Sequence, residues 1–333
     1  MLDGTLLDDA SAGRGGTLTA VPDFGANPGR LGMVLALPAG IGTEPVPLVV
    51  VLHGCLQTAA AYDRASGWSA LGSRHGFAVL YAEQQKRNNP NRCFNWFLRS
   101  HTTRGSGEAA SIRRMVEHAG ERAPIDPARI YVTGLSAGGA MAAALLAVYP
   151  DVFAAGAVVA GLPFRAATTL RGAVDAMANG TGRSPEDLAL AVKGASPHGG
   201  PWPRLAVIHG DADRTVAPAN AEDLVGQWRA LAGLPDRPTR EQAAGALRRR
   251  VWQGADGVAL LEDLRIAGLG HGAPTLGPAA GPFFLDAPAS ATHEAARFFG
   301  LPVSPPEAAP APAHADLLHR VGGFLRRLLS RSS

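Results

Sequence analysis

The chain has 333 residues, of which 46% are hydrophobic and 18% charged, and its formal net charge is +3. This apolar content is enough to bury a core, and the charge is too low to force disorder, so a wholly disordered chain is excluded. No apolar run reaches the roughly 18 residues that a bilayer-spanning helix needs. Because 29 of the 31 basic residues are Arg, the excess reflects overall composition, and we expect no nucleic-acid partner.

The first 30 residues are Gly-rich and weakly patterned, and we interpret residues 1–30 as an N-terminal extension. Short apolar runs alternate with helical segments in the following part. The predicted strands are Leu31–Leu37, Leu48–Leu52, Phe77–Tyr81, Ile130–Thr133, Ala155–Val159, Leu205–His209 and Val258–Ile266. The predicted helices are Ala60–His75, Glu108–Ala119, Ala137–Val148, Ala221–Ala232 and Ala291–Phe299. This alternation predicts an α/β fold with a doubly wound, mostly parallel sheet over residues 31–300.

Two segments depart from the alternation. Residues 162–203 separate two strands by about 40 positions, more than a simple crossover needs, and helical patches such as Ser184–Val192 suggest an inserted cap. Residues 301–314 are rich in Pro and Ala and are predicted to be a linker.

The last segment, residues 315–333, is predicted to form a basic amphipathic tail helix. Its apolar residues recur at three- and four-residue spacing: Leu317, Leu318, Val321, Phe324, Leu325, Leu328 and Leu329. Four arginines lie outside this stripe: Arg320, Arg326, Arg327 and Arg331. Packing on the preceding α/β domain, or fraying, is one interpretation, and binding to an apolar particle or a membrane surface is the other.

The strongest chemical signal is the G-x-S-x-G sequence from Gly134 to Gly138, which follows a predicted strand and opens a predicted helix. Small residues on both sides of Ser136 allow the sharp turn that raises a nucleophilic serine above a sheet. A Gly-rich turn with a helix-capping serine is the structural alternative. We favour Ser136 as a nucleophile.

A serine nucleophile needs a base, and the base needs an acid to orient it. Two carboxylates, Asp211 and Asp213, follow the predicted strand Leu205–His209, and we favour Asp213. His271 lies after the acid in a Gly-rich loop and is the predicted base. The later His293 falls within a predicted helix, which makes it a weaker candidate.

An oxyanion hole needs two backbone N–H groups, one from the residue after the nucleophile and one from a loop after an earlier strand. Ala137 supplies the first, and Cys55 supplies the second, with Leu56 as the alternative. Neither a metal-binding motif nor a phosphate-binding loop is found, so no metal and no cofactor are expected.

Cys55 and Cys93 are the two cysteines of the chain. They are either two separate buried thiols or one disulfide, and a disulfide would indicate an oxidising compartment. The N-terminal sequence shows no basic and apolar signal segment, which leaves a cytoplasmic location open.

The sequence resembles the poly(3-hydroxybutyrate) depolymerase esterases, a family of α/β-hydrolases with a lipase box. The resemblance is carried by segments such as HGCLQTAAAYDRASGW, QQKRNNPNRCFNWF, VTGLSAGGAM and HGDADRTVAPANAEDLVGQW. It implies an α/β-hydrolase fold, the triad Ser136, Asp213 and His271, and a disulfide between Cys55 and Cys93. The implied location is extracellular or periplasmic.

The resembling segments also place candidate residues at a substrate cleft: His53, Gln57, Asn95 and Trp96. For His53 a supporting role at the end of a strand is the alternative. The implied function is hydrolysis of short-chain poly- or oligo(3-hydroxyalkanoate) esters. A feruloyl or acetylxylan esterase and a non-catalytic binding protein on a hydrolase scaffold are the alternatives. Sequence leaves the oligomeric state undetermined.

Overall fold

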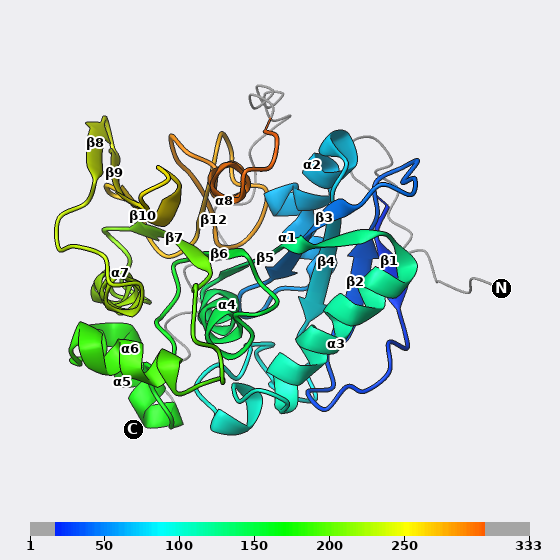
Figure 1. Ribbon diagram of the computed structural model, residues 1–333, viewed down its shortest axis with the longest axis horizontal. Helices are drawn as coiled ribbons and strands as arrows, with labels where there is room; N and C mark the ends of the chain where they lie inside the picture. Colours follow the sequence, from blue (N-terminus) through cyan, green and yellow to red (C-terminus); the bar gives the residue numbers. More distant parts are fainter. Residues whose placement is uncertain (1–16, 304–333) are drawn as a thin grey trace, which may run out of the picture.

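The computed structural model describes residues 17–303, and a ten-stranded sheet runs through this part of the chain (Figure 1). Six neighbouring strands, from β4 to β10 in the order below, run parallel, and the strands at both edges are antiparallel to their neighbours. From edge to edge the strands are β1 (Thr19–Val21), β2 (Gly32–Ala36), β4 (Ala78–Glu83), β3 (Val46–Leu52), β5 (Ile125–Leu135), β6 (Ala155–Val159), β7 (Arg204–Gly210), β10 (Ala259–Ile266), β9 (Leu247–Gln253) and β8 (Arg240–Ala244).

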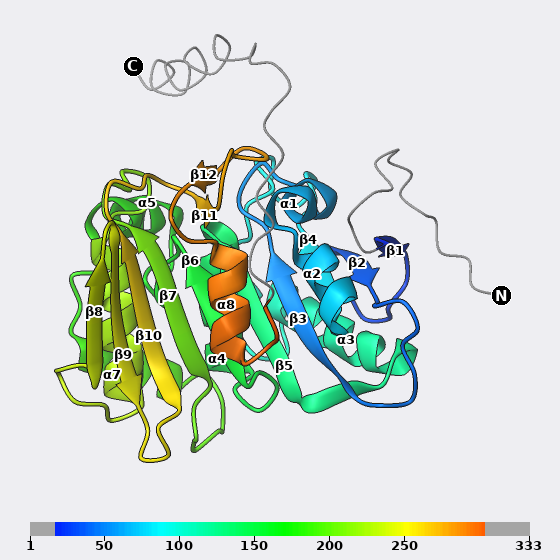
Figure 2. The same ribbon diagram turned by 90° about the horizontal axis from the view of Figure 1, so that it is seen from above.

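Helices cover both faces of the sheet and bury a separate apolar core on each (Figure 2). One face carries α3 (Gly107–Arg122), α4 (Ala137–Val148), α6 (Pro185–Lys193) and α7 (Ala219–Leu231). The other carries α1 (Ala59–Ser66), α2 (Trp68–His75) and α8 (Ala291–Phe299). The remaining elements are the short helix η1 (Arg99–His101), α5 (Leu170–Asn179) and the two-stranded sheet of β11 (Ala273–Thr275) and β12 (Phe284–Asp286). This doubly wound arrangement confirms the predicted fold class.

The middle strands are apolar on both faces because both faces are covered. In β3 every residue from Leu48 to Leu52 is fully buried. The helix α4 is buried along its whole length, which explains why its sequence, AGGAMAAALLAV, lacks a polar face. Strand β3 and helix α4, which are both buried, therefore form the centre of the fold.

The predicted helix Ala60–His75 is two helices. Gly67 lies between α1 and α2 with φ 73°, a left-handed conformation that favours glycine. The buried Asp63 carboxylate accepts the Ser69 backbone N–H at 2.9 Å and also bonds the Tyr81 hydroxyl. The chain therefore turns at Gly67 around a carboxylate that ties both helices to β4.

The predicted boundary at residue 31 lies too late in the chain. Strand β1 pairs antiparallel with β2, and the side chains of Val21 and Phe24 are buried in the core. Apolar residues are sparse here, and a three-residue edge strand leaves little periodicity to detect. The described residues before Leu31 thus pack as part of the same α/β domain and do not form a separate extension.

The segment predicted as a cap, residues 162–203, contains α5 and α6. Helix α6 packs on α7, where the buried Gln227 amide donates to the carbonyls of Phe164 and Leu188, both at 3.0 Å. On α5, Ala173 and Ala176 join a small apolar cluster. The segment therefore completes one helical layer through α6, while α5 belongs to a cluster beside the predicted nucleophile.

Strands β8 and β9 were not predicted, because the run Arg248 to Arg250 reads as a solvated charged stretch. In the structure each arginine meets a carboxylate: Arg248 contacts Glu241, Arg249 contacts Glu262 and Glu294, and Arg250 contacts Asp263 and Glu222. These ion pairs balance the charge of the three arginines, so that β9 and β8 can extend the sheet at this edge.

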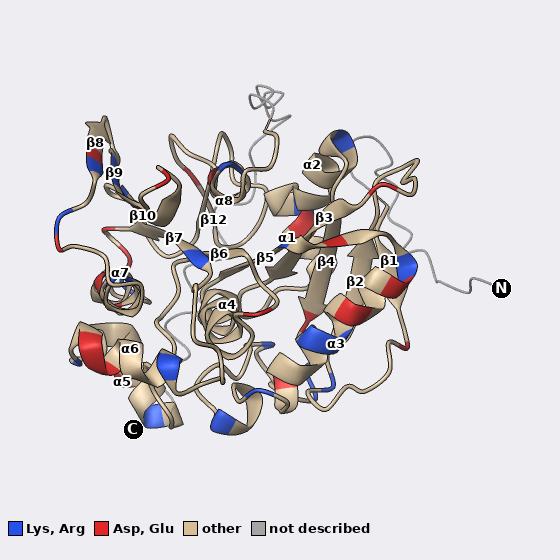
Figure 3. Cartoon of the chain, viewed as in Figure 1, with Lys and Arg blue, Asp and Glu red and all other residues tan. Residues whose placement is uncertain are grey.

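Surface charges of both signs lie close together on α3 (Figure 3), where Arg113 pairs with Glu117 at 3.0 Å and Arg114 with Glu121 at 2.8 Å. Within residues 17–303, no helix combines the length and apolar character needed to cross a bilayer. The tail predicted at residues 315–333 lies outside the described residues, as does most of the predicted linker.

Candidate active site

Ser136 occupies a sharp turn between β5 and α4. Its φ and ψ angles are 56° and −117°, a conformation that non-glycine residues rarely adopt, and its N–H donates to the Val159 carbonyl at 2.9 Å. A Cβ atom at Gly134 would lie 2.4 Å from the Gly138 backbone, and one at Gly138 would lie 2.4 Å from the Leu52 carbonyl oxygen. The two glycines of the motif are thus required by close backbone approach.

Ser136, His271 and Asp213 form a continuous hydrogen-bonded series. The Ser136 Oγ is 3.0 Å from His271 Nε2, and His271 Nδ1 is 2.8 Å from Asp213 Oδ2. The three side chains come from the carboxyl ends of β5, β10 and β7, which meet at one edge of a parallel sheet. The structure therefore brings together the three residues that the sequence singled out, over separations of up to 135 positions.

Asp213 is the carboxylate at this position, and Asp211 is not. Asp213 is 4% exposed, and its Oδ1 accepts the N–H groups of Thr215 and Val216, both at 2.9 Å. Burial by itself raises the pKa of Asp213, but hydrogen bonds from His209 and His271 outweigh it and hold this pKa well below its usual range. Asp211 is exposed, and its carboxylate instead accepts the Gly268 N–H at 2.6 Å.

The His271 loop is anchored by its neighbours. The Ala273 N–H donates to the Phe283 carbonyl at 2.7 Å, at the start of the β11 and β12 pairing. The Phe283 ring lies edge-on to the His271 imidazole at 6.2 Å between centroids. A Cβ at Gly272 would lie 2.6 Å from the Phe283 carbonyl oxygen. This Gly-rich segment is therefore shaped to hold the imidazole in place.

Two loops that approach Ser136 are joined by a disulfide between Cys55 and Cys93, with 4.3 Å between their Cα atoms. The pairing implied by the resemblance is therefore present. Beside it, the Leu56 N–H donates to the Asn91 carbonyl at 2.7 Å. Because that N–H is already used, Leu56 is unsuited to bind an oxyanion, and Cys55 and Ala137 stay as the candidates.

Three of the four predicted cleft residues have structural partners. The Nε2 of buried His53 accepts the Gln84 N–H at 3.0 Å, and its Nδ1–H donates to the Gly54 carbonyl at 2.7 Å. Gln57 bridges the Gly54 N–H and the Pro282 carbonyl, at 2.8 and 2.9 Å.

Asn95 is likewise held, because its backbone and side-chain N–H groups both donate to Glu108. The polar atoms of His53, Gln57 and Asn95 are thus bonded within the protein, and these residues support the loops beside Ser136. Trp96 differs, because it is 8% exposed and clusters with Ala137, next to the nucleophile. It is the one member of the four that the structure leaves as a candidate wall residue.

Glu108 is a buried carboxylate that the sequence analysis did not single out. It is fully buried at the start of α3 and accepts Gln84 Nε2–H at 2.7 Å, Asn95 N–H at 2.9 Å and Asn95 Nδ2–H at 2.6 Å. Gln84 also donates to the Cys93 carbonyl at 3.2 Å. Glu108 thus holds the disulfide loop in place through Gln84 and Asn95. Burial raises the pKa of Glu108 to about 7, although these hydrogen bonds act to lower it. A single Glu in a helical run carries no signal in sequence that could have revealed this role.

The raised pKa of Glu108 predicts a pH-dependent contribution to stability. Between about pH 5 and pH 7 the folded protein retains a proton on Glu108 that the unfolded chain has released, so its contribution to the free energy of unfolding falls as pH rises. The stability of the wild type relative to Glu108→Gln should fall by about 2–3 kcal/mol from pH 5 to pH 8.

Denaturant unfolding of both proteins at several pH values measures this difference. The control is Glu117→Gln on the exposed side of α3, for which the difference from wild type should stay constant over this range. A constant difference for Glu108→Gln would contradict the raised pKa.

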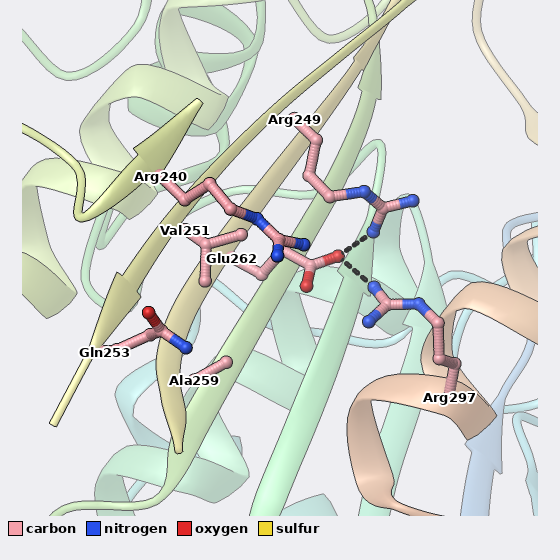
Figure 4. A pocket seen from close by; sticks show the side chains of 7 residues that line it. All are labelled: Arg240, Arg249, Val251, Gln253, Ala259, Glu262 and Arg297. Carbon is pink, nitrogen blue, oxygen red and sulfur yellow. Dashed lines mark hydrogen bonds and ion pairs between the residues drawn. The ribbon is translucent and has the colours of Figure 1, made fainter. Parts of the chain in front are cut away.

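A separate hollow lies on the α8 side of β9 and β10 (Figure 4). Its lining residues are Arg240, Arg249, Val251, Gln253, Ala259, Glu262 and Arg297. The Glu262 carboxylate bonds both Arg249 and Arg297, and it is the one acidic residue in a lining that holds three arginines. None of its lining residues belongs to the Ser136 series, and we do not assign it to the reaction.

A serine, a histidine and a buried carboxylate in series, at the carboxyl edge of a doubly wound sheet, define a serine hydrolase of the α/β-hydrolase class. Within this class the chain belongs to the Esterase PHB depolymerase family, whose model matches residues 31–253. The resemblance found in the sequence is therefore confirmed, and the protein is a carboxylic ester hydrolase.

The chain is similar to several named esterases. It is 44% identical over 293 residues to poly(3-hydroxyalkanoate) depolymerase C of Paucimonas lemoignei, covering 85% of this chain and 70% of that protein. It is 30% identical over 269 residues to feruloyl esterase B of Talaromyces stipitatus, covering 78% and 73%. Among solved structures, an acetyl xylan esterase from Aspergillus awamori matches with a TM-score of 0.69 and 28% identity, covering 77% of this chain and 94% of that chain.

Proposed function

We propose that the protein hydrolyses short-chain poly- or oligo(3-hydroxyalkanoate) esters through an acyl-enzyme on Ser136. The observation that carries this proposal is the hydrogen-bonded series from Ser136 through His271 to Asp213. The substrate class is supported by the 44% identity to a poly(3-hydroxyalkanoate) depolymerase, which exceeds the 30% identity to the feruloyl esterase and the 28% identity to the acetyl xylan esterase.

In the first half of the reaction the Ser136 Oγ attacks the ester carbonyl carbon, and its proton passes to His271 Nε2. The resulting tetrahedral intermediate collapses when the bond to the alcohol oxygen breaks. His271 then gives its proton to that oxygen, which leaves as the hydroxyl end of the shortened chain. Asp213 keeps the imidazole in the tautomer whose Nε2 accepts a proton, and its low pKa keeps it ionised.

In the second half His271 removes a proton from water, and the hydroxide attacks the acyl carbon on Ser136. Collapse releases the carboxylic acid and returns the proton to Ser136 Oγ. The negative oxygen of both intermediates is stabilised by the N–H groups of Ala137 and Cys55, which the strand end and the disulfide hold in place. Trp96 supplies an apolar wall for the short acyl chain.

Ser136→Ala should abolish hydrolysis of a 3-hydroxybutyrate oligomer while leaving the fold intact. Loss of the nucleophile costs roughly 10⁴-fold or more in kcat. Activity is measured with purified oligomer and folding by circular dichroism. A fluorophosphonate probe should label the wild type at Ser136 and leave the variant unlabelled. Retention of more than a few per cent of activity by the variant would contradict the mechanism, and a wild type that resists labelling would favour a non-catalytic binding protein.

A panel of soluble esters separates the two enzymatic alternatives. We expect the highest kcat/KM for a 3-hydroxybutyrate oligomer, by about tenfold or more over an acetylated xylo-oligosaccharide and methyl ferulate. The reason is that a short, branched aliphatic acyl chain fits the apolar cluster around Trp96 better than an aryl group does. A higher kcat/KM for either of the other esters would move the assignment to that esterase class.

We infer an extracellular or periplasmic location. The basis is the disulfide, because such bonds persist in oxidising compartments and are rare in the cytosol.

For residues 315–333 we propose a role in binding an apolar particle or membrane surface, which rests on the amphipathic sequence pattern. Removal of these residues should leave turnover of a soluble ester unchanged and weaken retention on poly(3-hydroxybutyrate) particles. Sedimentation of both proteins with particles measures retention, and anionic vesicles serve as the second surface. Equal retention on both surfaces by both proteins would contradict the anchor.

A further inference from the structure

A second histidine contacts the carboxylate of Asp213. His209 lies in β7, four positions before Asp213, and is 1% exposed. Its Nε2 is 2.9 Å from the Val216 carbonyl oxygen and 3.3 Å from Asp213 Oδ2. The histidine therefore sits on the side of the carboxylate away from the bulk solvent, where no substrate atom reaches it.

The protonation of His209 follows from these contacts. Both groups that face Nε2 are oxygen acceptors, so Nε2 carries a proton and donates it. The Nδ1 atom is buried and has no hydrogen-bond partner among the described residues. A proton on Nδ1 would be a buried donor without an acceptor, so His209 is the neutral Nε2–H tautomer. Leaving Nδ1 unpaired costs free energy, which the donation from Nε2 offsets.

The Asp213 carboxylate acts as the acceptor in each of its hydrogen bonds. Its Oδ1 accepts the N–H groups of Thr215 and Val216, and its Oδ2 accepts His271 Nδ1–H. The Oδ2 atom also lies 3.3 Å from His209 Nε2, whose N–H faces both this oxygen and the Val216 carbonyl. The backbone donors fix Oδ1, and the two imidazoles fix the direction of Oδ2. Without His209, Oδ2 would be held by His271 alone.

The surrounding backbone keeps these groups in one rigid unit. A Cβ at Gly210 would lie 2.1 Å from the Leu269 carbonyl oxygen, so the end of β7 and the His271 loop touch. The Asp211 and Ala212 N–H groups donate across this contact to Ile266 and Leu269, both at 3.1 Å. Among the described residues, Asp213 is the titratable group in contact with His209, and His271 is reached through it.

We propose that His209 is a positioning residue for ester hydrolysis, whose Nε2–H holds Asp213 Oδ2 toward His271. This inference rests on the proposed function, because it assigns the base and acid roles to His271 and Asp213. The competing interpretation is that His209 only ties down the Val216 carbonyl. That role would affect stability and leave the catalytic proton transfers unchanged.

The test compares His209→Leu, which removes the donor, with His209→Gln, whose amide N–H can take the place of Nε2–H. For His209→Leu we expect kcat to fall by about 10- to 100-fold with KM changed by less than about twofold, the range typical of residues that orient a catalytic ligand or base. His209→Gln should recover most of this loss. Equal losses in both variants would show that packing, and not donation, is what the site requires, and would overturn the proposal.

The pH profile of kcat/KM gives a readout that a purely structural role would not move. Removal of a donor leaves more negative charge on Asp213 Oδ2, which favours the His271 imidazolium. The acid limb of the profile should therefore move to higher pH in His209→Leu and return toward wild type in His209→Gln. An unmoved acid limb together with kcat within about threefold of wild type would overturn the proposal.

Two measurements keep the test independent of folding and of the ester chosen. In wild-type protein, ¹⁵N shifts of the imidazoles should identify His209 as the neutral Nε2–H tautomer at pH 8, and a proton on Nδ1 would overturn the proposal. The rate of Ser136 labelling by a fluorophosphonate should fall in His209→Leu in parallel with kcat. If wild-type protein labels but does not hydrolyse hydroxyalkanoate esters, the substrate assignment fails while the labelling rates still decide the role of His209.

The matched control is a histidine that also bonds a carbonyl but pairs with no carboxylate within residues 17–303. His198 Nε2 is 2.8 Å from the Pro201 carbonyl oxygen, in the segment before β7. His198→Leu should leave kcat, the labelling rate and the acid limb unchanged. A loss in His198→Leu comparable to that in His209→Leu would show that removing any carbonyl-bound histidine impairs the enzyme, and it would overturn a specific role for His209.

Discussion

Backbone crowding at the turn between β5 and α4 is the constraint on which the rest of the site depends. Gly134 and Gly138 have no room for a side chain, because the backbone of α4 and the end of β3 fill the space that a Cβ would need. This close approach forces Ser136 into its unusual φ and ψ angles and points the first turn of α4 at the site. The N–H of Ala137 and the Oγ of Ser136 are therefore placed by packing that also holds the central sheet together. Catalytic geometry and fold stability are coupled at this turn.

His271 and Asp213, the proposed base and acid, reach Ser136 because parallel strands end at a common edge. Strands β7 and β10 pair in parallel register up to Gly210 and Ile266, and the two loops that follow exchange backbone hydrogen bonds. This contact between the loops holds Asp213 and His271 beside each other, independently of their position relative to Ser136. On the other side, the disulfide and the Glu108 hydrogen bonds fix the loops after β3 and β4. The site is thus a meeting point of loops, each of which is held by its own buried contacts.

Sequence reasoning succeeded where local pattern and function coincide. The apolar runs predicted the middle strands. The Gly-x-Ser-x-Gly motif located Ser136 because the tight turn around it has room only for glycine at Gly134 and Gly138. It failed where a residue gains its role from a distant partner. The Arg248 to Arg250 run becomes a strand only because carboxylates on β8, β10, α7 and α8 neutralise it. His53, Gln57 and Asn95 were placed near the correct loops, but their orientation depends on Gln84, Pro282 and Glu108, which no local pattern connects to them.

Two His-Gly pairs at strand ends support the two halves of the machinery in the same way. His53-Gly54 ends β3 and stabilises the loop that presents Cys55, while His209-Gly210 ends β7 and contacts the loop that presents Asp213. Both imidazoles are buried; His53 bonds the protein through both ring nitrogens, and His209 does so through Nε2 alone. Gly210 allows the Leu269 carbonyl to approach closely. Burial lowers the pKa of His53, which keeps it neutral so that its Nε2 accepts the Gln84 N–H. Buried imidazoles therefore lie on both sides of Ser136, and His271, which is partly exposed, is the one of these three histidines that contacts both Ser136 and Asp213.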